Sequence, residues 1–187
     1  LDLGLSSLQV DDPARGFSFM REGPLDMRMD HRQELTAGDI VNTYSETQIA
    51  DILKRYGEEP HARRIARAIG KERAKERIQT TTHLAEVVRT AVPRKRAKPR
   101  IHPATRTFQA LRIEVNSELE GLSMALEQGI MRLKARGRMV VISFHSLEDR
   151  IVKRKLAALA RGCVCPPEFP QCMCGKKPLL KILTTKP

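Results

Sequence analysis

The chain has 187 residues, a formal net charge of +12 and four cysteines. This length allows one substantial hydrophobic core, or one core with a smaller appended lobe. No run approaches the roughly eighteen apolar residues of a membrane-spanning helix, and nothing resembles a cleaved signal peptide, so both classes are excluded and a soluble, cytoplasmic protein is predicted.

Residues 1–30 are predicted to form a strand followed by a long loop. The chain starts on the apolar run Leu1-Asp2-Leu3 and not on an initiator Met, so we expect it to be part of a longer polypeptide. A buried parallel strand with this pattern would carry Asp2 to its carboxyl end, the edge at which open α/β sheets bind ligands. The loop is rich in Gly and Pro, yet it carries the apolar residues Phe17, Phe19, Met20, Leu25, Met27 and Met29. It is either an ordered functional loop or a packed surface loop.

A block of helices is predicted between residues 36 and 92, where apolar residues recur at helical spacing. The start and stop signals are Thr36 as a cap, a capping box at residues 45–48, Gly57 as a stop, Pro60 as a start and a break at residues 80–82.

The excess positive charge lies in residues 61–112. This segment holds 15 Lys or Arg against 3 Glu, whereas the rest of the chain holds 19 basic and 19 acidic residues. Such a concentration is typical of a protein that binds the phosphate backbone of a nucleic acid, although a solvated helical face with a basic linker has the same composition. The candidate RNA-binding residues are Arg63, Arg64, Arg67, Arg94, Lys95, Arg96, Lys98 and Arg106.

The last part of the chain is predicted to contain helices and strands. His102 opens one helix, and a second capping box at residues 117–120 opens the next. Residues 139–142 are a continuous apolar run of strand length, Ser146 would cap the helix after it, and residues 179–183 form a late strand.

Strand segments at both ends with helices between them indicate an α/β sheet that is interrupted by an all-helical insertion. We expect residues 1–35 and 106–187 to form the sheet domain and residues 36–105 to form the insertion, a substrate-recognition domain that carries most of the basic charge.

Three separated motifs resemble those of one enzyme family. They are D-L-G-x-S-S-x-Q at residues 2–9 with R-G-F-S-F and G-P-L-D-M-R-M-D in the loop after it, H-P-A-T-R-T-F-Q-A-L-R-I-x-V-N-x-E-L at residues 102–119, and V-I-S-F-H-S-L-E-D-R-I-V-K at residues 141–153. In residue pattern and in order along the chain, they are similar to the motifs of the 16S ribosomal RNA (cytosine-N4)-methyltransferase family, the MraW-like family.

The resemblance implies a class I, Rossmann-like methyltransferase sheet, of which this chain covers only part. It also implies transfer of a methyl group from S-adenosylmethionine to the N4 exocyclic amine of a cytosine in the decoding region of 16S ribosomal RNA, with the small ribosomal subunit as partner. In the family, a glycine-rich loop that holds the donor precedes the D-L-G strand. The sequence contains no such loop, so this chain alone is expected to be inactive.

The resemblance assigns the donor contacts to Asp2 and Gln9, the Asp and Gln of the first motif. Leu8 stands where many members have Pro, a departure that affects the stiffness of the loop. From the residue pattern alone, Asp2 could also be a capping carboxylate in a turn.

Ser143 and His145, together with Asp2, are the candidate catalytic residues. Methyl transfer to an amine is an in-line displacement that needs aligned reactants and hydrogen-bond acceptors around the amine. Ser143 and His145 follow the second predicted strand, and in a parallel sheet they would face the same crevice as Asp2. His145 could instead satisfy the helix that follows it. The candidate stacking surfaces for a splayed base, which core packing explains equally well, are Phe17, Phe19 and Phe144.

Cys163, Cys165, Cys172 and Cys174 form a C-x-C-x6-C-x-C pattern. Four thiolates this close in sequence could close a tetrahedral zinc site, although the spacing differs from the common C-x2-C type. Disulfides are disfavoured in an intracellular setting, and nothing in the chemistry of the family that the chain resembles requires a metal. A structural zinc ion and unliganded cysteines are therefore both open.

A rival interpretation from another functional class is a non-catalytic nucleic-acid-binding protein, in which a basic helical module carries a zinc-stapled tail. A glycine-rich loop upstream of Leu1 would favour the enzyme, and a true start at Leu1 would favour the binding module.

Overall fold

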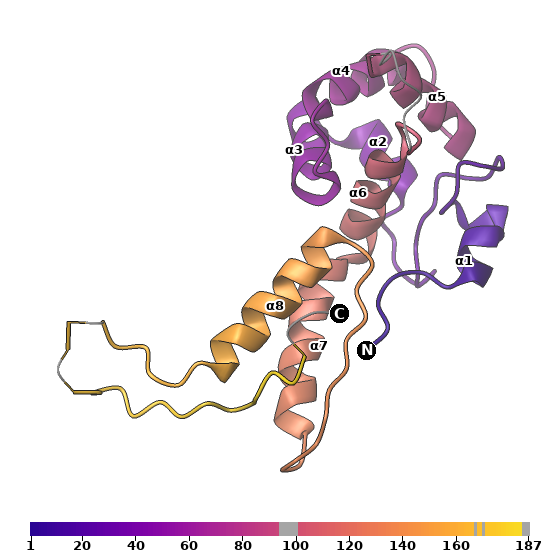
Figure 1. Ribbon diagram of the computed structural model, residues 1–187. Helices are drawn as coiled ribbons and strands as arrows, with labels where there is room; N and C mark the ends of the chain where they lie inside the picture. Colours follow the sequence, from indigo (N-terminus) through magenta and orange to yellow (C-terminus); the bar gives the residue numbers. More distant parts are fainter. Residues whose placement is uncertain (94–100, 167, 170, 185–187) are drawn as a thin grey trace. The chain divides into compact units, whose positions relative to one another are not determined.

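The computed structural model describes residues 1–93, 101–166, 168–169 and 171–184, and the chain divides into two compact units (Figure 1). The helical unit is Leu5–Glu118, and the discontinuous unit combines Leu1–Gly4 with Leu119–Pro187. A bilayer-spanning helix is absent from the described ranges, because every helix there falls short in length or hydropathy.

The helical unit is a bundle of short helices. Its elements are α1 (Ser7–Asp11), the 3-10 helix η1 (Pro13–Arg15), α2 (Ala37–Thr43), α3 (Glu46–Gly57), α4 (Ala62–Arg73), α5 (Thr81–Ala91) and α6 (Thr105–Asn116). Helix α3 packs against α4 and α6, α4 packs against α5, and α2 contacts α4 and α6. The core consists of fully buried aliphatic side chains, which are Ile40, Ile49, Leu53, Ile65, Ile69, Leu84, Leu111 and Ile113. Removing their apolar surface from water stabilises the unit.

The predicted helix starts at Thr36 and Ser45 are confirmed. Each hydroxyl accepts a hydrogen bond from the backbone N–H of the third helical residue, whose side chain in turn accepts one from the backbone N–H of the cap residue. Thr80, predicted as part of a break, is the cap of α5 and accepts a bond from the His83 N–H. These capping signals depend on residues that are close in the sequence, and the structure contains the hydrogen bonds that they predict.

The predicted stop at Gly57 is correct in place but wrong in mechanism. Gly57 is the last residue of α3, and Glu58 takes the left-handed cap position after it, with a φ of 46°. Glycine is needed because a Cβ atom there would lie 2.6 Å from the carbonyl oxygen of Arg106 on α6. Pro60 lies before α4 and not in its first turn, because His61 is the cap residue of that helix.

The loop of residues 12–33, which we call the motif loop, is ordered and packed into the helical unit. Leu25 and Met27 are buried, and Met27 is held at a φ of 64°. Asn116 at the end of α6 donates a hydrogen bond to the Met27 carbonyl (2.8 Å) and accepts one from the Met29 N–H (2.7 Å). The segment just before it, predicted to be irregular, instead forms α1, whose capping box uses Ser6.

Two segments of the motif loop cross so closely that both crossing points require glycine. A Cβ atom on Gly16, which has a φ of 71°, would lie 2.2 Å from the Pro24 carbonyl oxygen. A Cβ atom on Gly23 would lie 1.9 Å from the Pro13 carbonyl oxygen. The two glycines therefore set the path of the loop through backbone contact.

The discontinuous unit contains the last two helices, α7 (Glu118–Arg132) and α8 (Ser146–Ala160). An ion pair between Lys155 and Glu127 joins them. The second predicted capping box is wrong, because Ser117 has a φ of 47° and closes α6 in the left-handed conformation. An extended backbone, which a helix-capping serine needs, is not available at that residue.

The predicted sheet is present only at single points of pairing. Within the described residues these are a parallel bridge between Asp2 and Ile142 and an antiparallel bridge between Pro24 and Thr80. Residues 139–142 form no longer ladder and Val140 is 69% exposed, while residues 179–183, predicted as a strand, form none. A strand-like sequence forms a ladder only where a neighbouring strand supplies partners for its backbone groups.

Candidate functional site

Two segments far apart in the sequence pair side by side in the discontinuous unit. Ile142 donates its N–H to the Leu1 carbonyl (2.9 Å), and Leu3 donates to the Ile142 carbonyl (3.1 Å), which makes the bridge of Asp2 with Ile142 parallel. The direction of pairing agrees with the sequence prediction. It brings Asp2 to the same edge as the residues that follow Ile142. We call Asp2, Ser143, Phe144 and His145 the strand-end cluster.

Asp2 and Phe144 both open onto solvent. The Asp2 side chain is exposed, and within the described residues its carboxylate accepts no hydrogen bond. Phe144 is 70% exposed, and its ring lies 3.3 Å from the position that a Cβ atom would take on Gly4. Gly4 has a φ of 93°, which favours glycine in the turn after Asp2. An open carboxylate near an open aromatic ring can bind a polar ligand with a planar group.

The structure gives His145 a helix-capping role. His145, and not Ser146 as predicted, is the N-cap of α8, and its Nδ1 accepts a hydrogen bond from the Glu148 N–H (3.4 Å). The predicted cap is wrong by one residue because an imidazole nitrogen can accept the bond that a serine hydroxyl usually accepts. A contact between His145 and substrate stays a prediction, as does a catalytic role for Ser143.

Glu148 is a buried carboxylate that the sequence interpretation missed. Its Oε2 accepts hydrogen bonds from the N–H groups of Phe144 (3.0 Å) and His145 (3.3 Å), which fixes the backbone of these two residues of the strand-end cluster. Burial raises the pKa of the Glu148 carboxyl, but the His145 imidazole, whose Nε2 lies 3.3 Å from Glu148 Oε1, and the hydrogen bonds from these N–H groups outweigh burial and hold the pKa below its ordinary value. The signal that could have found it is a Glu three residues after a cap, with His admitted as the cap.

Gln9 lies in the helical unit, where it helps to cap α1. Its Oε1 accepts hydrogen bonds from the N–H (3.0 Å) and the hydroxyl (3.2 Å) of Ser6. Because the carbonyl oxygen is engaged in this way, the amide nitrogen is the group that Gln9 has left to donate to a ligand. Its contact with a methyl donor stays a prediction.

The aromatic residues of the motif loop have different environments. Phe17 is buried and packs in the core, with the Arg15 guanidinium 5.7 Å from the centre of its ring. Phe19 is partly exposed, and its ring centre lies 4.6 Å from that of His102 and 4.8 Å from that of Phe108. The sequence interpretation took His102 only as a helix start, and no local spacing could have paired it with Phe19.

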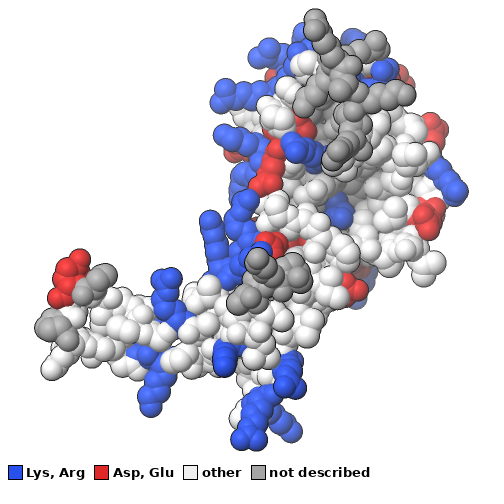
Figure 2. Space-filling model, in the orientation of Figure 1, with Lys and Arg blue, Asp and Glu red and all other residues white. Residues whose placement is uncertain are grey.

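The exposed side of α4 carries a row of cations. Arg63, Arg67 and Lys71 recur every four residues with Arg64 beside them, and all four are exposed. Within the described ranges none of the four makes an ion pair or a side-chain hydrogen bond. We call these four residues the basic stripe. Figure 2 shows Lys and Arg side chains gathered over the region of α3 and α4, with fewer acidic side chains among them.

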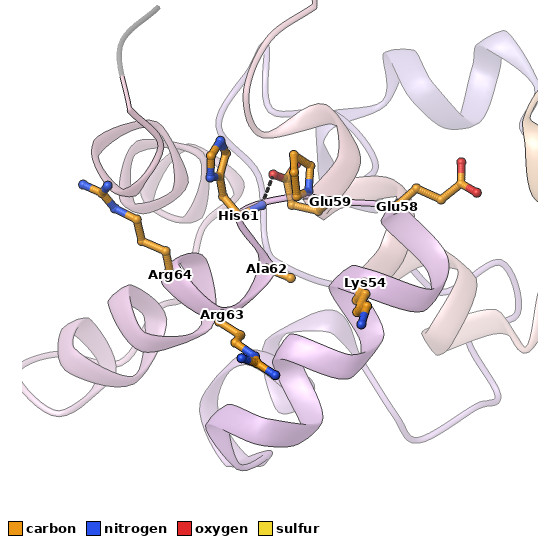
Figure 3. Close-up of a pocket in the computed structure, with 8 residues that line it drawn as sticks. Lys54, Glu58, Glu59, His61, Ala62, Arg63 and Arg64 are labelled. Carbon is orange, nitrogen blue, oxygen red and sulfur yellow. Dashed lines mark hydrogen bonds between the residues drawn. The ribbon is translucent and has the colours of Figure 1, made fainter.

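A hollow borders the basic stripe where α3 ends and α4 begins (Figure 3). The residues that line it are Lys54, Glu58, Glu59, Pro60, His61, Ala62, Arg63 and Arg64. The buried Glu59 carboxylate accepts a hydrogen bond from the His61 backbone N–H (2.9 Å), shown as a dashed line in Figure 3. Side chains of both charges line the hollow, and Glu59 serves to fix the start of α4.

The remaining predicted RNA-binding residues lie in two places. Arg106 is exposed, and its guanidinium donates a hydrogen bond to the Glu58 carbonyl (3.1 Å), which ties α6 to the end of α3. The other four, which lie outside the described residues, are Arg94, Lys95, Arg96 and Lys98.

The four cysteines converge in the segment after α8. The Sγ atoms of Cys163, Cys165, Cys172 and Cys174 all lie within 4.8 Å of one another, and all four thiols are free. Hydrogen bonds from backbone N–H groups lower the pKa of the Cys174 thiol to about 6. A backbone N–H acts in the same direction on Cys163, but the neighbouring sulfur atoms outweigh it and raise the pKa of Cys163 to about 12.

Comparison with known proteins gives a consistent result. The family model described as the MraW methylase family matches residues 1–187. The ribosomal RNA small subunit methyltransferase H of Clostridium botulinum (strain Kyoto / Type A2) is 52% identical over 187 residues, which are 100% of this chain and 60% of the relative. The protein of the same name from Geotalea uraniireducens is 56% identical over the same shares. The chain thus spans about three-fifths of the length of the curated relatives it matches.

Proposed function

This chain belongs to the MraW methylase family, and on that premise we propose that the whole protein methylates the N4 exocyclic amine of a cytosine in the decoding region of 16S ribosomal RNA, with S-adenosylmethionine as methyl donor. Family membership implies the class I methyltransferase fold, into which the helical insertion of residues 36–105 would be set. The names of the relatives support a ribosomal RNA substrate. The protein would act in the cytoplasm on the small ribosomal subunit.

The observation that carries the proposal is the open carboxylate of Asp2 at the paired strand end. S-adenosylmethionine has hydroxyl and amino hydrogens that a carboxylate can accept, and oxygen atoms to which a carboxamide nitrogen can donate. Asp2 accepts no hydrogen bond within the described residues, so its carboxylate can accept one from such a ligand. Taken by itself, Gln9 has its amide nitrogen left to donate, which agrees with the donor contact that the resemblance implies. The donor carries the methyl group on a sulfonium sulfur, and the protein positions that methyl group for transfer.

The residues after Ile142 fit the second reactant. The Ser143 hydroxyl can accept a hydrogen bond from an exocyclic amine, and the exposed Phe144 ring offers a surface for a base taken out of its stack. Glu148 holds the backbone N–H of Phe144, and the capping bond of His145 holds the start of α8, which directly follows these residues. In-line transfer depends on alignment, so we assign positioning roles to Ser143 and Phe144.

The basic stripe supports the RNA-binding part of the proposal. Cations that neutralise phosphates release counterions, and this favours binding in a way that salt weakens. A cation that already pairs with a group of the protein gains less free energy from binding a phosphate. Arg63, Arg67 and Lys71 have no ion-pair or hydrogen-bond partner for their side chains in the described residues. We propose that the stripe contacts the RNA backbone together with the linker cations Arg94, Lys95, Arg96 and Lys98.

A non-catalytic nucleic-acid-binding module is the weaker alternative. It would account for the basic stripe, but it would give no use to the motif that carries Asp2 and Gln9. A family match that covers residues 1–187 therefore favours the enzyme.

The test is to map the product of the reaction. The whole protein is incubated with methyl-labelled S-adenosylmethionine and unmodified small ribosomal subunits, and the RNA nucleosides are identified by mass spectrometry. We expect N4-methylcytosine at one position, with strong loss in Asp2→Asn and little change in the control Asp11→Asn, an exposed carboxylate at the end of α1. A methyl label on carbon 5 of cytosine or on ribose would contradict the proposal. The absence of any label on the RNA, in protein that still binds the donor, would also contradict it.

A further inference from the structure

The four cysteines after α8 are a cluster that methyl transfer does not use. They are all the cysteines of the chain. Two pairs of sulfur atoms lie especially close: Cys172 Sγ is 3.6 Å from Cys174 Sγ, which is 3.8 Å from Cys163 Sγ. Thiols that lie this close together without forming a disulfide are typical of a metal site.

The sulfur–sulfur distances of 3.6 and 3.8 Å match a tetrahedral zinc centre, and all four sulfur atoms lie within 4.8 Å of one another. A zinc–sulfur bond of about 2.3 Å in a regular tetrahedron places the sulfur atoms about 3.8 Å apart. A disulfide would need about 2.05 Å between two sulfurs, far less than the observed separations. Four sulfur ligands with no oxygen donor select zinc or iron over magnesium or calcium.

The backbone around the cluster is also arranged as in a thiolate site. Cys163 Sγ accepts a hydrogen bond from the Cys165 N–H (3.4 Å), Cys165 Sγ from the Met173 N–H (3.4 Å), and Cys174 Sγ from the Val164 N–H (3.5 Å). Donors of this kind stabilise the negative sulfur and orient it toward a metal.

The segment has little else to hold it in this shape. Its described residues form no helix or strand, and its larger apolar side chains are exposed, with Met173 at 79%. Its ties to α8 include the hydrogen bond from the Leu179 N–H to the Leu159 carbonyl (3.0 Å) and that from Lys176 Nζ to the Ala158 carbonyl (3.2 Å). Closing a loop costs entropy, and none of the described residues after α8 is buried in a hydrophobic core that would offset this cost.

We propose that Cys163, Cys165, Cys172 and Cys174 bind one zinc ion as a closed tetrathiolate site. Because all four positions are taken by protein sulfur, the role is structural: the ion closes the loop after α8 and takes no part in methyl transfer. Four thiolates leave the centre with a net negative charge, and three cations, Arg161, Lys176 and Lys177, lie within three residues of the cysteines in the sequence.

The first experiment measures metal content. The whole protein, purified under reducing conditions without chelator, should contain one equivalent of zinc by mass spectrometry of the metal. Cys165→Ser and Cys172→Ser should each lose it, whereas Met173→Ser, a sulfur residue between two of the ligands, should keep it. The cobalt-substituted protein should show the intense absorption of tetrahedral thiolate coordination.

A second measurement does not depend on a variant that might misfold. In the wild-type protein, chelation of the metal should make the loop after α8 more susceptible to proteolysis. Added zinc should lower the rate at which the loop is cleaved by about a hundredfold when the free zinc concentration is about a hundred times its Kd. Iron in place of zinc, four freely titrating thiols with no metal, or two disulfides in the purified protein would each overturn the proposal.

Discussion

The motif loop and the basic stripe are both rich in arginine, but their arginines have opposite uses. In the motif loop, Arg15 donates to the carbonyls of Arg28 (2.9 Å) and Met29 (3.1 Å), and Arg28 pairs with Asp26 (2.8 Å). In the stripe, the cations lie on an exposed helix face without partners among the described residues. The arginines of the motif loop stabilise the conformation of the loop through their hydrogen bonds and ion pairs. The cations of the basic stripe, which have no such partners in the described residues, are available to bind another molecule.

A single helix contains both kinds of arginine. Arg73 on α4 donates to the carbonyls of Val41 (2.9 Å) and Tyr44 (2.6 Å), and so satisfies the end of α2. Arg67, less than two turns earlier, has no such partner in the described part of the chain. The difference follows from the face of the helix and not from residue type, so variants on the two faces can separate folding from binding.

The largest effect is expected in the motif loop at Gly23→Ala. A Cβ atom at this position would lie 1.9 Å from the Pro13 carbonyl oxygen, so the backbone must move. We expect a loss of at least about 3 kcal/mol in the free energy of unfolding, measured with urea. The control is Gly121→Ala in α7, where nothing lies within 4 Å, and which should be neutral or stabilising by up to about 1 kcal/mol. Equal stability of the two variants would break the comparison.

The next effect is expected at Arg73→Gln. It leaves two backbone carbonyls without their charged donor, which should cost about 1–3 kcal/mol of the free energy of unfolding. The matched variant Arg67→Gln on the same helix should change the free energy of unfolding by less than about 0.5 kcal/mol. If Arg67→Gln proved the more destabilising of the two, the division between used and free charges would be wrong.

Local signals explain how much of this fold could be predicted. Thr36 and Ser45 cap their helices through bonds to residues three positions away, and such patterns can be read from the sequence. The apolar run at residues 139–142 indicated a segment that would pair, and its parallel partner was expected from the run that carries Asp2. The family resemblance added the donor contacts, which no local pattern contains.

The features that could not be predicted depend on tertiary contact. Gly57 looked like a left-handed cap, yet its lack of a Cβ serves the close approach of Arg106 on another helix. Asn116 holds the motif loop through two bonds that span most of the helical unit in sequence. The ladder expected at residues 179–183 is missing because no neighbouring strand accompanies it in the described residues. None of these could be read from residue spacing alone.

A smaller effect in the motif loop is the pH dependence due to Asp26. Hydrogen bonds from Arg28 hold the pKa of the Asp26 carboxyl below its ordinary value of 3.8. A lowered pKa in the folded state adds stability that is present above the ordinary value and is lost as the pH falls through the folded value. We expect Asp26→Asn to be less stable at pH 7 and to lose less stability below about pH 4. Urea unfolding at a series of pH values checks this, with the exposed Asp51→Asn as control. A wild-type pH slope in Asp26→Asn would refute the prediction.

The smallest effect on folding is expected from the triple change Arg63→Gln, Arg67→Gln and Lys71→Gln. The free energy of unfolding should change by less than about 1 kcal/mol. RNA binding should nevertheless weaken, and the slope of log affinity against log salt should become shallower by about 2, at roughly 0.7 per single-strand contact. Binding across a salt series measures this, with Arg73→Gln as the variant that should keep the slope. An unchanged slope in the triple variant would move the RNA surface away from α4.

The central claim is that Asp2, at the paired strand end, holds the methyl donor. Titration calorimetry of S-adenosylmethionine into the whole protein tests it most directly. We expect Asp2→Ala to weaken binding by about tenfold or more, the cost of losing a hydrogen bond to a charged group, and Asp11→Ala to bind like the wild type. Unfolding curves should show that both variants are folded. Wild-type affinity in Asp2→Ala would contradict the account.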